Sequence, residues 1–243
     1  MRKHVLWLWA IFTLAPVGAS AEDLPKPLRI PAEVTYEQAA IMKEAIELHD
    51  RGDYDRAIEK YESILSASPD TVAAIYEMGY SYFAKQDYKK ALELCEKGAA
   101  YDSDLLPTFY MQIASCSDHL GDWEKAIEIY ARVIREYPRT PLVRFNLALT
   151  CSQHEKPDLA ISNLKEELYL TPDHPTSHLL LGALFNGGDY RIPAIFALSR
   201  FLILEPQSGR SAGALEILQE LIHRGVEARE GKNIRITLIP GAR

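Results

Sequence analysis

Apolar residues recur along most of this chain at spacings of three, four and seven, which is the pattern of amphipathic helices. In residues 38–71 the apolar or small positions are Ile41, Ala45, Leu48, Tyr54, Ala57, Ile58, Tyr61, Ile64 and Leu65. Pro69 ends this run, since proline lacks an N–H group and disfavours helical geometry in the residue before it. The pattern predicts two helices joined by a tight turn near Gly52, each with one apolar face.

The turn of this hairpin returns four more times along the chain. Its alanine, Ala57, has counterparts at Ala91, Ala126, Ala160 and Ala194, at intervals of 34, 35, 34 and 34 residues. A fixed period in this range is the signature of stacked repeats rather than of one globular core. We expect each alanine to lie where its two helices come closest, because a larger side chain would push them apart.

Three other kinds of position recur with the same period. A small residue stands eight positions into each unit, an aromatic residue precedes the turn alanine in three units, and a proline closes four units. These are, in turn, Ala45, Gly79, Ala114, Ala148 and Gly182; Tyr54, Tyr88 and Trp123; and Pro69, Pro138, Pro172 and Pro206. In this pattern the chain resembles five tetratricopeptide repeats over 38–208, with the units 38–71, 72–105, 107–140, 141–174 and 175–208. The resemblance implies an all-α fold, a right-handed α-solenoid of helical hairpins.

Some units depart from the pattern. The second unit has Ser103 at the proline site and one extra residue near Leu106, so we expect a different stacking angle there. The fourth unit has Pro157 in place of the turn aromatic. The fifth has its aromatic, Tyr190, one residue early, and Pro193 in the first turn of its second helix, where proline is tolerated.

The N-terminal segment has the features of an export signal. Two basic residues precede a ten-residue apolar run over 5–14, and the small residues Ala19-Ser20-Ala21 follow. The run is about half of the twenty residues that span a bilayer, so an uncleaved anchor is the weaker alternative. The sequence predicts a signal peptide over 1–21. No cysteine follows it before Cys95, so the lipid-attachment arrangement of bacterial lipoproteins is absent. We expect an exported protein, periplasmic or secreted, with no transmembrane helix in its mature form.

The segments flanking the repeats carry other patterns. Residues 22–36 contain three prolines and predict an extended leader, with the first helix beginning near Thr35, where cap chemistry is available. Residues 209–225 predict a capping helix that covers the last repeat. In the remaining segment, 226–243, the nearly alternating residues 233–240 predict a single strand, for which an all-helical protein offers no ladder partner.

Composition narrows the class of function. The formal charge of −7 lacks the basic character of nucleic-acid-binding proteins, and 47% hydrophobic residues supply a sizeable core. The three cysteines, Cys95, Cys116 and Cys151, lack metal-type spacing. They are interpreted as buried apolar residues, with the alternative that two of them form one disulfide and leave one free thiol.

The resemblance implies a concave contact face formed by the first helices of the units. The residues predicted to form this groove are mostly apolar or aromatic: Met42, Ile46, Tyr76, Tyr80, Phe83, Met111, Phe145, Leu149 and Leu179. Such a face suits an apolar peptide or helix of another envelope protein, and predicts a binding scaffold rather than an enzyme, with no small-molecule substrate. The alternative is that adjacent helices bury these side chains as core.

A second kind of recognition is not predicted. The chaperone-binding members of the family hold a terminal carboxylate with Lys, Asn and Arg on the first helices. At the matching positions here only Lys43 and Gln112 can serve.

Two alternative functions stay open. The C-terminal strand can dock on a neighbouring chain and build a homo-oligomer, or can occupy the groove itself. A remote alternative is a thiol or metal enzyme, in which Cys116 and His119 act beside Asp118, or in which His174 and His178 bind a metal. Pro175 between the two histidines predicts a loop, and no glycine-rich phosphate loop or nucleophile elbow is present. We therefore predict no catalytic residue, no metal site and no cofactor.

Overall fold

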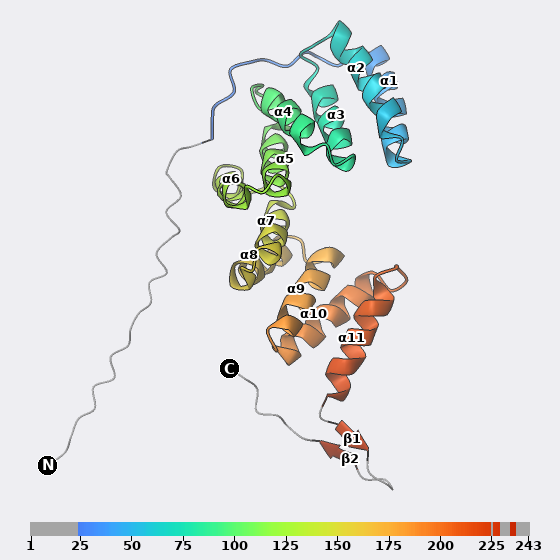
Figure 1. Cartoon of the computed structure of the whole chain (residues 1–243), viewed down its shortest axis with the longest axis vertical. Coiled ribbons are helices and arrows are strands. Elements are labelled where there is room, and N and C mark those ends of the chain that lie inside the picture. The colour runs from blue at the N-terminus through green and yellow to red at the C-terminus, as the bar shows by residue number, and fades with distance from the viewer. Residues whose placement is uncertain (1–23, 225, 229–233, 237–243) are drawn as a thin grey trace, which may run out of the picture.

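The computed structural model describes residues 24–224, 226–228 and 234–236, and its helices follow one another along an arc with α1 and α11 at the two ends (Figure 1). The elements are α1 (Tyr36–Asp50), α2 (Tyr54–Ala67), α3 (Val72–Ala84), α4 (Tyr88–Gly98), α5 (Leu106–His119), α6 (Trp123–Glu136), α7 (Val143–Gln153), α8 (Pro157–Leu170), α9 (Pro175–Gly187), α10 (Arg191–Leu204), α11 (Ser211–His223), β1 (Val226–Ala228) and β2 (Ile234–Ile236). The fold of this described part is all-α apart from the two short strands. The predicted signal peptide, 1–21, lies outside the described residues.

The first helix begins where the sequence predicts. Thr35 is the N-cap of α1: its hydroxyl oxygen accepts a hydrogen bond from the Gln38 N–H at 3.2 Å, and the Gln38 side chain accepts one from the Thr35 N–H at 2.9 Å. This reciprocal pair is a capping box, which satisfies two N–H groups that have no partner inside the helix.

The recurring turn has one backbone feature in every period. The residue just before the N-cap of the second helix of each pair adopts a positive φ: Gly52 (81°), Gln86 (65°), Gly121 (96°), Glu155 (56°) and Asp189 (57°). The left-handed conformation reverses the chain direction within a few residues, and only glycine adopts it without steric cost. Two of the five turns therefore use glycine, which this geometry favours. The other three hold a residue with a side chain in a backbone conformation that costs it energy.

We expect Gly121→Ala to lower the free energy of unfolding by about 1 kcal/mol, because a Cβ is disfavoured at this φ. A Cβ at this position meets no atom within 4 Å, so backbone strain is the cause. The control is Gly213→Ala in α11, where φ is not positive and the Cβ also meets nothing; helix propensity there favours alanine. Urea unfolding of both variants checks the prediction, and equal stability changes would contradict it.

The turn alanines lie in the tightest part of the core. Ala57, Ala91, Ala126, Ala160 and Ala194 are all fully buried, as close helix packing requires. The most extensive contacts join α1 to α2, α3 to α4, α5 to α6, α7 to α8 and α9 to α10. One apolar cluster contains Leu24 and extends from Val72 to Ala197, a second lies mostly in α1, α2 and α3, and a third joins α9, α10 and α11. The core is thus distributed along the chain rather than gathered at one centre.

The leader has no helix in residues 24–35 and packs onto the helices of the repeats. The Leu24 N–H donates to Glu136 Oε1 of α6 at 3.0 Å, and the Tyr110 hydroxyl of α5 donates to the Pro25 carbonyl at 2.7 Å. Farther along, Arg29 forms an isolated parallel bridge with Tyr101, just after α4. The leader therefore ties together helices that are distant from it in sequence.

The C-terminal segment differs from the expectation of a lone strand. β2 pairs antiparallel with β1, with Val226 opposite Ile236. The prediction missed β1 because a three-residue segment is too short to show an alternating pattern. β2 has a strand partner in its own chain. The lack of such a partner is therefore no longer a reason to expect that the tail pairs with a neighbouring chain. Residues 233 and 237–240 of the predicted strand lie outside the described part.

Candidate functional site

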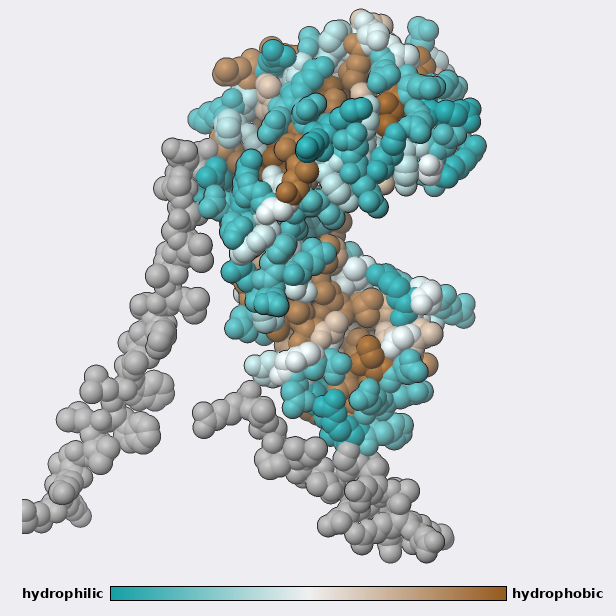
Figure 2. All heavy atoms as spheres, viewed as in Figure 1, coloured by the Kyte–Doolittle hydropathy of each residue, from teal (hydrophilic) through white to brown (hydrophobic). Residues whose placement is uncertain are grey.

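The predicted groove residues fall into three groups by exposure. Ile46, Tyr80 and Leu149 are exposed, and Tyr80 keeps 46% of its surface accessible. Half-buried positions are Met42, Tyr76, Phe83, Phe145 and Leu179, whereas Met111 is buried in the core. The alternative that these side chains are core therefore holds for Met111. The face in view in Figure 2 is largely polar, with apolar residues gathered where α9 and α10 lie.

An aromatic row crosses α1, α3 and α5. The imidazole of His49 stacks on the Tyr80 ring with centroids 4.9 Å apart, Tyr80 is parallel to Tyr76 at 6.4 Å, and Tyr76 meets Phe109 edge-on at 5.6 Å. Burial lowers the pKa of His49 and raises the pKa of Tyr76 to about 12. Both groups are therefore uncharged at neutral pH, and this row offers an apolar surface with ring edges and faces.

A smaller aromatic contact lies on the C-terminal half of the molecule. Phe145 of α7 meets the His174 ring edge-on, with centroids 5.0 Å apart. Burial, followed by the nearby His178 and Arg210, lowers the pKa of His174, so this imidazole is also neutral at pH 7. The half-buried Phe145 therefore has an uncharged neighbour, as Tyr80 has.

The histidine pair considered for metal binding is already engaged. Pro175 is the first residue of α9, so His178 lies in the helix rather than in a loop, and His174 is its N-cap. His174 Nδ1 lies 2.7 Å from Ser177 Oγ, and His178 Nε2 lies 2.8 Å from the Pro172 carbonyl. Among the described residues no group of three or more His, Cys, Asp or Glu is placed to hold a metal ion.

The residues considered for thiol chemistry are also separated by their contacts. Cys116 is fully buried, and burial raises its pKa to about 12, so its thiol stays protonated at neutral pH. His119 stacks on Tyr88 with centroids 4.4 Å apart. Asp118 binds α7 instead: it accepts from the Thr150 hydroxyl at 2.7 Å and contacts His154 Nε2 at 2.7 Å. All three cysteines are buried free thiols, and no disulfide joins two of them.

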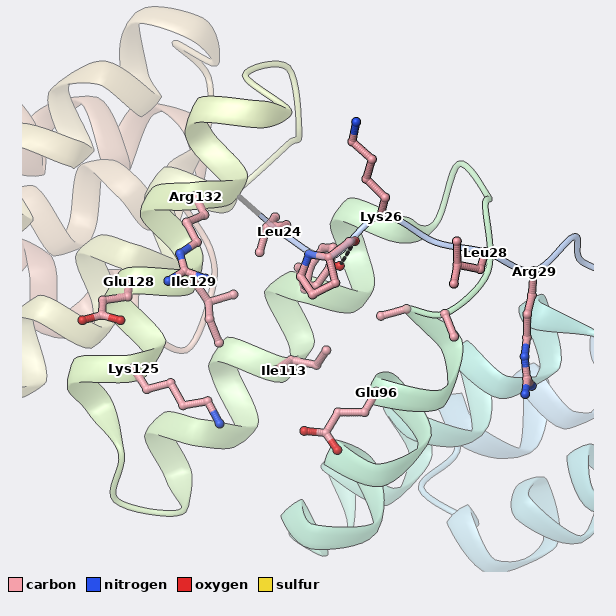
Figure 3. A pocket seen from close by; sticks show the side chains of 14 residues that line it. Leu24, Lys26, Leu28, Arg29, Glu96, Ile113, Lys125, Glu128, Ile129 and Arg132 are labelled. Atoms are coloured by element: carbon pink, nitrogen blue, oxygen red, sulfur yellow. Dashed lines mark hydrogen bonds between the residues drawn. The ribbon is translucent and has the colours of Figure 1, made fainter. Parts of the chain in front are cut away.

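A cavity that the sequence did not indicate lies beneath the leader. It measures about 630 Å³, and its walls come from the leader, α4, α5 and α6 (Figure 3). Ile113 and Ile129 supply apolar walls, while Glu96 and Lys125 face each other across its mouth (Figure 3). Its size is typical of ligand pockets, but the leader already closes one side.

No helix in the described ranges has both the length and the apolar character needed to cross a bilayer.

Comparison with known proteins places part of the chain in a family. Two family models, both described as tetratricopeptide repeat, match residues 48–109 and 109–140. The chain is 30% identical over 125 residues to the BBSome complex member BBS4 of Bos taurus, a match that covers 50% of this chain and 23% of that protein. It thus spans about a quarter of the length of this curated relative.

Solved structures share the fold. The chain is similar to TTC0263, a thermophilic tetratricopeptide-repeat protein of Thermus thermophilus, with a TM-score of 0.64 and 21% identity, covering 74% of this chain and 99% of that one. It is also similar to YrrB, described as a tetratricopeptide-repeat protein with an unusual peptide-binding site, with a TM-score of 0.51 and 19% identity, covering 72% and 90%. Residues 48–140 are therefore a tetratricopeptide-repeat segment, and the fold around them is that of tetratricopeptide-repeat proteins.

Proposed function

We propose that this protein is a non-catalytic scaffold that holds an apolar peptide or helix of another envelope protein along its concave groove. The observation that carries the proposal is the row of uncharged rings around Tyr80, which stays partly exposed although its neighbours pack closely. Phe145, Ile46 and Leu149 extend this apolar character to other helices. Aromatic and aliphatic side chains on adjacent helices form the kind of groove that binds helices and extended segments.

Exposed aromatic surface supports the proposal. Tyr80 keeps 46% of its surface accessible, and Tyr76, Phe83 and Phe145 each keep a smaller part. An aromatic side chain contributes about 150–250 Å² when a partner buries it fully, so even partial covering of these rings gives a partner apolar contact area.

Three finer features belong to the same proposal. We assign the five units 38–71, 72–105, 107–140, 141–174 and 175–208 as repeats of a right-handed solenoid, with α11 as the cap, which the burial of the turn alanines supports. The apolar run and small residues of 1–21 support export to the periplasm or outside the cell. The peptide-binding site that names YrrB supports a peptide as partner, by analogy of fold.

The test is recovery of a partner with a changed groove. A crosslinker placed at Tyr76 captures the partner in the native host and identifies it. The double variant Tyr80→Glu, Phe145→Glu is then expected to reduce recovery of that partner at least tenfold, because two charges are placed in an apolar contact. The matched control is Tyr36→Glu, Phe196→Glu, which changes one tyrosine and one phenylalanine that are exposed outside the predicted groove. Circular dichroism monitors helix content in both variants.

Full recovery by the groove variant, with its helix content intact, would refute the proposal. Equal losses in the groove and control variants would also refute it, since the effect would then follow from surface charge and not from the groove.

A further inference from the structure

At two consecutive turns of the chain, an aromatic ring stacks on a histidine ring. Tyr88, at the start of α4, stacks on His119 at the end of α5, with centroids 4.4 Å apart and planes within 5°. Trp123, at the start of α6, stacks on His154 just after α7, at 5.0 Å and 15°. In each case the aromatic residue of one helix pair packs against the imidazole at the turn of the next pair.

The next turn along the chain lacks both members of this stack. At the position equivalent to Tyr88 and Trp123 stands Pro157, the first residue of α8. The positions equivalent to His119 and His154 are Gly187 and Gly188, which end α9. The Tyr190 ring lies against Gly188, 2.9 Å from where a Cβ would stand, so the place left without a ring is the one that Tyr88 and Trp123 fill at the two preceding turns.

An open crevice lies at this place. It measures about 500 Å³, within the range of ligand sites, and is lined by residues of α7, α8 and α9 and by Tyr190. Ile161, Leu180 and Leu184 supply apolar walls, and Ser152 and Asp158 supply oxygen atoms. Of the joints between consecutive helices of the described chain, the one between α8 and α9 has the fewest contacts.

We propose that this crevice, the α8–α9 crevice, receives one aromatic side chain of the partner, a tryptophan or tyrosine that takes the place of the missing ring. The inference rests on the proposed function, because it locates an anchor for the partner held in the groove. The occupant follows from the repeat itself, since the chain fills the two equivalent places with an indole and a phenol. The oxygen atoms of Ser152 and Asp158 are acceptors for an indole N–H or a phenol O–H.

The crevice borders the predicted inner face of the repeats. Ala183 lines it and is exposed on α9, at one of the positions that face inward in the repeat, and Ser152 holds such a position on α7. A segment lying along the first helices therefore passes the mouth of the crevice and can insert a side chain without leaving the groove. Buried aromatic anchors in pockets are the side chains that dominate interface energetics.

Two variants fill the crevice from within. A Cβ at Gly187 meets no atom within 4 Å, so Gly187→Trp is accommodated and places an indole at the crevice. Pro157→Trp restores the ring that the two preceding turns carry. Gly188 is unsuitable, because its Cβ would lie 2.9 Å from the Tyr190 ring. The matched control is Gly213→Trp in α11, where a Cβ also meets nothing within 4 Å.

The probe is N-acetyl-5-fluorotryptophanamide, whose ¹⁹F resonance is followed during titration with the full mature protein. A single side chain in a pocket binds in about the millimolar range. We expect both filled variants to bind the probe at least tenfold more weakly than the wild type and the Gly213→Trp variant to bind it equally well. Equal binding by wild type and Gly187→Trp, or equal binding of N-acetylleucinamide by the wild type, would overturn the proposal.

Recovery of the crosslinked partner separates this inference from the proposed function. We expect Gly187→Trp to reduce recovery at least tenfold. Unchanged recovery by Gly187→Trp, with loss of recovery in the Tyr80→Glu, Phe145→Glu variant, would overturn the proposed anchor in the crevice. The proposed binding of the partner in the groove would then still stand. Loss of recovery in the Gly187→Trp variant, with full recovery by the Tyr80→Glu, Phe145→Glu variant, would support the crevice as the anchor and refute the groove.

Discussion

Replacing Gly98 by alanine is expected to lower the free energy of unfolding by about 2 kcal/mol, because overpacking in a close-packed core costs about 1–3 kcal/mol. A Cβ at Gly98 would lie 2.2 Å from Cε1 and 2.3 Å from Cζ of Phe109. The phenyl ring cannot yield easily, since Phe109 is fully buried and Tyr76 packs against it edge-on. The joint between α4 and α5 therefore has room for no side chain at this position.

Chemical unfolding followed by circular dichroism measures the effect. Gly79→Ala is the matched control, because its Cβ would meet Cys95 Sγ at 3.4 Å, an ordinary contact, and alanine favours the helix by about 1 kcal/mol. Combining Gly98→Ala with Phe109→Leu should recover part of the loss, since the two residues are in direct contact. A Gly98→Ala variant as stable as the Gly79→Ala variant would show that the interface relaxes and would contradict the prediction.

Replacing Leu24 by alanine is expected to lower the free energy of unfolding by about 2–3 kcal/mol, the lower part of the range of about 2–5 kcal/mol for removing a large buried apolar side chain. Leu24 is 6% exposed, although it lies in a proline-rich leader and not in a helix. It belongs to the long apolar cluster, which includes residues of α4, α5 and α6, and its N–H donates to Glu136. Loss of its side chain weakens the attachment of the leader to three helices at once.

The leader contains its own control. Leu28, four residues later, is 94% exposed, so Leu28→Ala is expected to change the free energy of unfolding by less than about 0.5 kcal/mol. Hydrogen exchange should show faster opening of the Asp102 N–H, which donates to the Arg29 carbonyl, in the Leu24 variant and not in the Leu28 variant. If both variants unfold at the same denaturant concentration, the leader is not part of the cooperative structure.

The helical architecture could be predicted from the sequence because its determinants are local. Thr35 caps α1 as expected, since the capping box involves residues three apart. The turn alanines are fully buried, as expected, because each lies where the two helices of a pair pack closely. The left-handed turns at Gln86 and Glu155 were not predicted, because neither residue type favours that conformation.

The candidate site was predictable only in part. The sequence predicts which residues lie on the inner face, and this stays a prediction. It could not separate the exposed Tyr80 from the buried Met111, because exposure depends on how neighbouring helices approach each side chain. Pro157 was visible as a departure from the pattern. The crevice beside it required the structure, since its other wall comes from α9, about thirty residues later.

The sequence by itself determined the helices, their period and the small residues at which they touch, because these depend on contacts within one repeat or between adjacent helices. Tertiary structure alone decided the contact of Leu24 with Glu136, 112 residues away, and the pairing of β1 with β2. It also decided which rings of the groove remain exposed. The Leu24 contact and the exposure of the rings depend on how successive helix pairs are inclined to one another, and that angle follows from packing between units, which a one-dimensional pattern does not record. The strand pairing depends on a chain reversal between β1 and β2, which three-residue strands are too short to reveal.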